Sequence, residues 1–200
     1  MNTMKKLLAL LLTLLIAVTM TTALTGCGDK DKDDDKDSKS ASDKDKGDDE
    51  DKDEGFNEKA VKKIVSAYLD AMLDGDAEGL LKCSLPDEDE LWDVMEEEEN
   101  TTREDLLDTL EATVSSIVEL KEIGVEFTYS IDDVEEMDLD DFSEDMIDEF
   151  KGADMEVTCC ATATVTFEES YEGESETQTM EVTCYKCDGK WYCLGDQSDL

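Results

Sequence analysis

The chain has 200 residues, of which 57 are acidic and 18 are basic, so its formal net charge is −39 at pH 7. So strong a negative charge repels nucleic acid and anionic lipid headgroups, and we expect neither as a partner. Histidine is absent, which removes the usual general base and the commonest metal ligand. No nucleophile elbow, phosphate-binding loop or HExxH motif occurs either. We therefore expect no enzyme, no cofactor and no metal site.

The first residues have the pattern of a secretory signal peptide. Lys5 and Lys6 precede an apolar run over residues 7–18, and small or hydroxylated side chains then lead to Gly26 and Cys27. The apolar run is shorter than the roughly 20 residues that a membrane-spanning helix needs. The sequence therefore predicts export, with residues 1–26 as the cleaved signal.

The end of this segment, LTGC at residues 24–27, resembles the lipobox of bacterial lipoproteins. In such proteins cleavage occurs before the cysteine, and its thiol receives a diacylglycerol. The resemblance implies a mature chain that begins at Cys27 and is held by its lipid in the cell membrane, on the extracytoplasmic face. The membrane is then a partner through this anchor alone.

A tether is expected after the lipidated cysteine, over residues 27–55. Residues 29–55 hold 14 acidic and 7 basic side chains and no apolar side chain larger than Ala41. Such a segment buries too little surface to offset the entropy lost on ordering. Its excess of negative charge should keep it extended.

Residues 56–200 have the length and composition of one domain with its own core. They hold 43 acidic and 9 basic residues. Apolar side chains at helical spacing, with capping residues before them, predict four helices in the first half. These helices run between Asn57 and Gly75, over residues 77–83, after Asp87, and between Thr102 and Gly124.

The second half changes to a period of two, which is typical of strands. A strand is predicted over residues 125–131 and a helix, capped by Asp138, over residues 139–150. Three antiparallel strands should follow, over residues 155–169, 177–187 and 190–194, the last two joined by a type I′ turn at Asp188-Gly189. The fold class expected is α+β, with the N-terminal helices packed on one face of a curved antiparallel sheet.

This order of elements, together with the lipobox, the charged tether and DGKWY at residues 188–192, resembles the NTF2-like (cystatin-like) lipoproteins of Gram-positive bacteria. The resemblance covers most of residues 56–195. It implies a sheet wrapped around a helix, with a cone-shaped cavity, and it transfers no catalytic residue. Trp92, Trp191 and Tyr192 are the candidate cavity-lining residues, with packing in the core as the alternative.

Two function classes fit these features. The first is a non-catalytic surface lipoprotein that scaffolds or contacts another envelope protein. The second is a lipoprotein that binds a small ligand or a cation, through the cavity or through acidic stretches such as residues 96–100 and 132–149. We favour the interpretation that those stretches are solvated faces that keep the protein soluble.

Six cysteines remain when Cys27 is set aside. An even number of cysteines in an exported chain favours disulfides. We expect three pairs, from the strongest expectation to the weakest: Cys160–Cys187, Cys184–Cys193 and Cys83–Cys159. An error of two residues in strand register would exchange the partners of Cys83, Cys159, Cys184 and Cys193. Two alternatives stay open. One is a zinc site in which Cys184 and Cys187 join Cys159 and Cys160, and the other is six free thiols in a reducing habitat.

Replacing Cys27 tests the anchor. Cys27→Ser removes the thiol that would carry the lipid, so the protein should leave the membrane fraction or accumulate with its signal uncleaved. Cell fractionation and intact mass measure this, with wild type as the control. An unmodified mature N-terminus elsewhere in the wild-type chain would contradict the prediction.

Overall fold

In the computed structural model, residues 55–195 are described. The expected signal peptide, Cys27 and nearly all of the tether lie outside this part of the chain. Within it, no helix is both long enough and apolar enough to cross a membrane.

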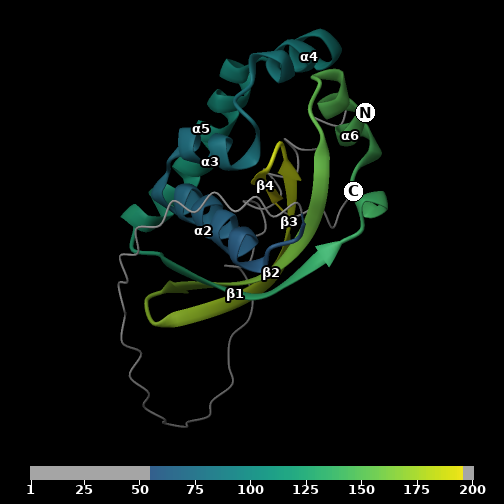
Figure 1. Cartoon of the computed structure of the whole chain (residues 1–200). Coiled ribbons are helices and arrows are strands. Elements are labelled where there is room, and N and C mark those ends of the chain that lie inside the picture. Colours follow the sequence, from purple (N-terminus) through teal and green to yellow (C-terminus); the bar gives the residue numbers. More distant parts are fainter. Residues whose placement is uncertain (1–54, 196–200) are drawn as a thin grey trace, which may run out of the picture.

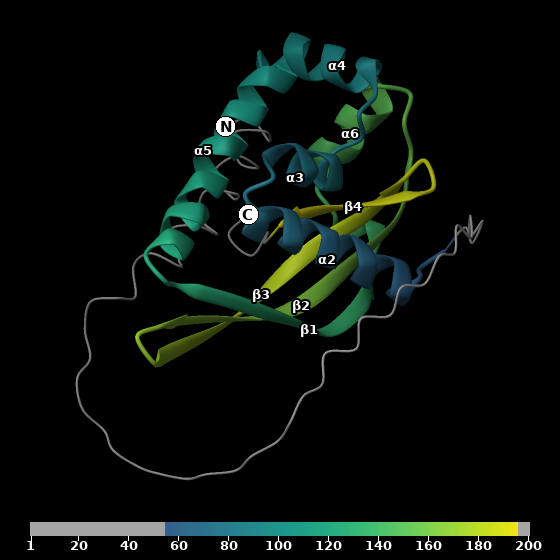
Figure 2. The same ribbon diagram turned by 90° about the vertical axis from the view of Figure 1, so that its left-hand side faces the viewer.

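The described residues form an α+β fold with four helices before the first strand (Figure 1). A single sheet in the order β1-β2-β3-β4 is antiparallel throughout and is not closed. In both Figure 1 and Figure 2, α2 lies across one face of this sheet. The elements are α2 (Glu58–Asp74), α3 (Ala77–Ser84), α4 (Asp89–Glu99), α5 (Arg103–Glu122), β1 (Glu126–Met137), η1 (Leu139–Asp141), α6 (Glu144–Gly152), β2 (Val157–Tyr171), β3 (Glu174–Cys187) and β4 (Lys190–Gly195).

Side-chain caps mark the starts of α2 and α5, as the sequence predicts. Asp138, predicted to cap the next helix, precedes η1 and forms no side-chain cap. The Asn57 side chain accepts a hydrogen bond from the Ala60 amide at 3.1 Å and so caps α2. At the start of α5, Thr102 and Asp105 form a reciprocal capping box. The α+β class and the three-stranded C-terminal meander are thus confirmed.

Two predicted boundaries were wrong. The predicted helix over residues 139–150 is divided into η1 and α6 at Phe142, whose backbone is extended. The break lets the buried rings of Phe142 and Phe150 both pack on Tyr185, at centroid distances of 5.7 and 5.2 Å. The predicted strand over residues 125–131 continues to Met137 through an irregularity beside Asp132, because the long β2 supplies further pairing partners.

Small side chains on β2 make room for α2. Ala161, Ala163 and Val165 alternate along β2 and are fully buried. Facing them, α2 buries its own apolar stripe and is tied to β1, because the Tyr129 hydroxyl donates to the Asp70 carboxylate at 2.7 Å. The helix buries Val61, Val65, Tyr68, Leu69 and Met72.

The junction of α2 and α3 depends on Gly75. This residue has φ +75°, and a Cβ built on it would lie 2.6 Å from Val118 Cγ2 of α5. Gly75→Ala should therefore lower the free energy of unfolding by about 2 kcal/mol, from backbone strain and the clash together. Urea unfolding of the full-length chain measures it.

Gly173→Ala is the matched control for this variant. Gly173 also has a positive φ, +88°, but nothing lies within 4 Å of its added Cβ. Only the backbone term applies, and the loss should be about 1 kcal/mol. Equal losses in the two variants would show that the approach of Val118 does not matter.

Candidate functional site

Five of the six described cysteines lie buried at one end of the sheet, and Cys83 on α3 is half-buried. All six carry free thiols. The predicted turn at Asp188-Gly189 is confirmed: both residues have positive φ, as a type I′ turn requires. This turn places Cys184 directly opposite Cys193, with their sulfur atoms 3.3 Å apart. The pair thus meets the register that the predicted Cys184–Cys193 bridge requires.

The register expected for Cys160 and Cys187 was wrong. The β2–β3 turn uses Glu172 and Gly173 in place of Gly173 and Glu174, and this shift pairs Cys160 with Tyr185. An irregularity next to Val157 then places Cys187 opposite that valine. The two thiols that were expected to face each other are therefore not cross-strand partners, and the bridge between them stays a prediction without that support.

The third expected pair, Cys83 and Cys159, has different neighbours in the structure. Cys159 Sγ lies 3.9 Å from a carboxylate oxygen of Glu136. Burial, and then the nearby Cys184 and Cys83 thiols, raise the pKa of Cys193 well above its usual value. Because α3, which carries Cys83, contacts β4, which carries Cys193, Cys83 lies near the Cys184–Cys193 pair. This is one of the exchanges of partner left open by the sequence.

These buried thiols are weakly acidic. Burial raises the pKa of Cys160 and that of Cys187 from 9.0 to about 12. They are protonated near neutral pH, whereas the thiolate is the form that attacks disulfides and binds metals. Among residues 55–195 no group of three or more cysteine or acidic side chains is placed to hold a metal ion.

The three aromatic residues expected to line a cavity pack against the core. Trp191 and Tyr192 on β4 are 9% and 8% exposed, and the Tyr192 ring stacks on Tyr185 at 5.4 Å. Trp92 on α4 is partly buried, and its indole nitrogen has no hydrogen-bond partner among the described residues. None of the three belongs to the groove described next.

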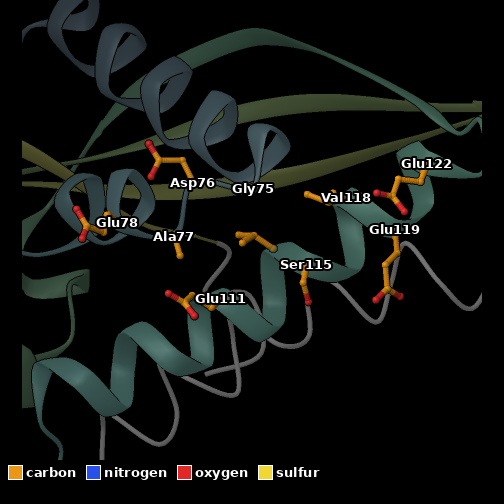
Figure 3. A pocket seen from close by; sticks show the side chains of 10 residues that line it. Gly75, Asp76, Ala77, Glu78, Glu111, Ser115, Val118, Glu119 and Glu122 are labelled. Carbon is orange, nitrogen blue, oxygen red and sulfur yellow. The ribbon is translucent and has the colours of Figure 1, made fainter.

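A groove of about 600 Å³ lies between α5 and the junction of α2 with α3 (Figure 3). Gly75, Asp76, Ala77 and Glu78 line one side, and residues of α5 line the other. The α5 side consists of Glu111, Val114, Ser115, Val118, Glu119 and Glu122. Five of the ten lining residues are acidic, so the groove carries a dense negative charge.

The carboxylates of the groove fall into two groups. Asp76 accepts a hydrogen bond from the Gly79 amide at 2.9 Å, and Glu78 pairs with Lys82 at 3.3 Å. On α5, Glu111, Glu119 and Glu122 form no ion pair with another of residues 55–195. These three lie on the solvent-facing side of the helix, open to a ligand.

Sequence reasoning missed this groove. Its two sides are more than 30 residues apart in the chain, and neither carries a local motif. One signal was present: Glu111, Ser115, Glu119 and Glu122 recur at spacings of four and three, which places them on one face of α5. That pattern marks a polar helix face, but it does not predict what lies opposite.

No model of a protein family matches the sequence, and no curated protein or solved structure matches the chain. The expected kinship with NTF2-like lipoproteins is untested by these comparisons and stays a prediction.

Buried thiols predict a fall in stability at alkaline pH. The pKa of Cys160 and of Cys187 is about 12 in the folded state and near 9.0 for an exposed thiol, so the unfolded chain loses these protons first. Their contribution to stability is complete below pH 9 and is lost as the pH rises towards 12. The melting temperature of the reduced full-length chain should therefore fall between pH 8 and about 10.5.

A double variant, Cys160→Ala with Cys187→Ala, serves as the control. Its melting temperature should fall less steeply with pH, because two titrating groups are gone. Some dependence should remain, since burial also raises the pKa of Tyr192 to about 12. An unchanged slope would show that these two thiols do not carry the effect.

Proposed function

We propose that this chain is a membrane-anchored surface lipoprotein whose folded domain is a non-catalytic interaction module of the cell envelope. Its partner is a basic segment of another envelope protein, which lies in the acidic groove beside α5. The lipobox at residues 24–27 supports the anchor, and the groove is the observation that carries the binding role. The packing of α2 across one face of a curved antiparallel sheet supports an NTF2-like domain.

The chemistry of the groove favours a ligand with several positive charges. Glu111 and Glu122 are three helical turns apart on α5, so the carboxylates extend along the groove and do not converge on one point. Lysine or arginine side chains spaced along a peptide would each meet a carboxylate. Val114 and Val118 on the same helix would contact the aliphatic parts of such side chains.

A divalent cation is the second candidate ligand. Carboxylate oxygens are the ligands that calcium prefers, but among residues 55–195 no three acidic side chains are placed to hold one ion. A cation would draw neighbouring side chains together, whereas a basic peptide would leave them spread along the helix. Direct titration with each ligand therefore distinguishes the two candidates.

Binding of an oligolysine peptide to the full-length chain tests the proposal. The triple variant Glu111→Gln, Glu119→Gln, Glu122→Gln removes the α5 carboxylates with little change of shape. Each exposed pair contributes about 0.5 kcal/mol, so the dissociation constant should rise about tenfold. Calorimetry or fluorescence anisotropy at fixed salt gives the constant.

A second triple variant has the same net charge as the first and controls for general electrostatic attraction. Glu135→Gln, Asp140→Asn and Glu144→Gln remove three exposed carboxylates from β1, η1 and α6. The peptide should bind this variant within about twofold of wild type, because the groove is intact. Equal weakening in both variants would contradict binding at the groove. Saturable binding of calcium alone, lost only in the first variant, would favour the second candidate.

A further inference from the structure

Cys184 and Cys193 are arranged as a reactive pair. They are direct cross-strand partners on β3 and β4, their sulfur atoms are 3.3 Å apart, and neither side chain is exposed. Ala161 on β2 is the partner of Cys184 on its other side, and its small side chain leaves the pair space. A short movement of the two sulfur atoms would bring them to bonding distance, without a change of strand register.

We propose that Cys184 and Cys193 form a disulfide by thiol–disulfide exchange that enters the protein at Cys83. The site is a three-thiol relay, with one accessible sulfur and a buried pair. It is independent of the acidic groove and of the partner proposed for it.

Accessibility points to Cys83 as the entry. An external disulfide must reach a sulfur atom along the line of its S–S bond, and the fully buried pair gives it no such path. Cys83 is the half-buried thiol of the six, while the other five are buried.

The fold holds Cys83 close to the pair. The helix that carries Cys83, α3, contacts β4, the strand that carries Cys193. At the end of this helix the Tyr185 hydroxyl donates a hydrogen bond to the Ser84 carbonyl oxygen at 2.8 Å. This bond fixes the end of α3 against β3 and β4. Tyr68 is fully buried on α2, which contacts α3, β3 and β4. Burial, and then the neighbouring Cys193, Cys184 and Cys83, raise its pKa. The Tyr68 hydroxyl has no hydrogen-bond partner among the described residues.

The exchange proceeds in three balanced steps. The Cys83 thiolate attacks an external disulfide, forming a mixed disulfide and releasing one thiol. The Cys193 sulfur, having lost its proton, then attacks Cys83 and releases the second thiol. Finally Cys184 attacks Cys193, and Cys83 leaves as a thiolate that regains a proton. In total, two protein thiols are oxidised to one disulfide, and one external disulfide is reduced to two thiols.

Peptide mapping of the full-length chain tests the bridge itself. The reduced protein is exposed to oxidised glutathione, alkylated, and digested with trypsin and a glutamate-specific protease. Cleavage after Lys82, Glu181, Lys186 and Lys190 separates Cys83, Cys184, Cys187 and Cys193 into different peptides. We expect residues 182–186 joined to the peptide that begins at Trp191. A different connectivity, or alkylation of both Cys184 and Cys193, would overturn the proposal.

Single variants test the route. In Cys83→Ser the bridge should form about tenfold more slowly, whereas the buried control Cys187→Ser should form it within about twofold of the wild-type rate. In Cys193→Ser, glutathione should remain attached to Cys83. In Cys184→Ser, a Cys83–Cys193 bridge should accumulate. An unchanged rate in Cys83→Ser, or glutathione found first on another cysteine, would overturn entry at Cys83.

Discussion

The packing of α2 on the small-residue stripe of β2 is the contact on which the other elements depend. Ala161 and Ala163 bring the helix close to the sheet, and the helix then contacts all four strands. With α2 in place, the sharp turn at Gly75 directs α3 back along the domain, and Val118 of α5 closes over that turn. The acidic groove and the position of Cys83 both follow from this arrangement, since each is built on α3.

The same packing explains the distribution of charge. The apolar side chains of the helices and of the sheet are buried in the core, and most carboxylates lie at the surface. Few lysines are available to pair with them, and the recorded ion pairs join exposed side chains, several of them within one helix. Such pairs contribute little to stability. The fold is therefore held by apolar burial, and its surface charge is available for interactions with other molecules.

Sequence reasoning succeeded where a structure is specified by neighbouring residues. Three such features are each specified by residues within four positions of one another: the cap at Asn57, the capping box of Thr102 with Asp105, and the turn at Asp188-Gly189. It failed where two local choices were nearly equal. Both Glu172-Gly173 and Gly173-Glu174 are plausible turn residues, and the choice moved the partner of Cys160 by two positions. The break at Phe142 and the groove depend on partners far along the chain, which no local pattern specifies.

The first strand has a consequence for assembly. β1 is an edge of the sheet, and along its 12 residues it carries Glu126, Asp132, Asp133, Glu135 and Glu136. A second copy that added its own β1 here would lie about 4.8 Å away and would align rows of like charge. Such repulsion blocks the growth of a continuous sheet between molecules. Many copies can then be packed side by side at high local concentration without polymerising into fibrils.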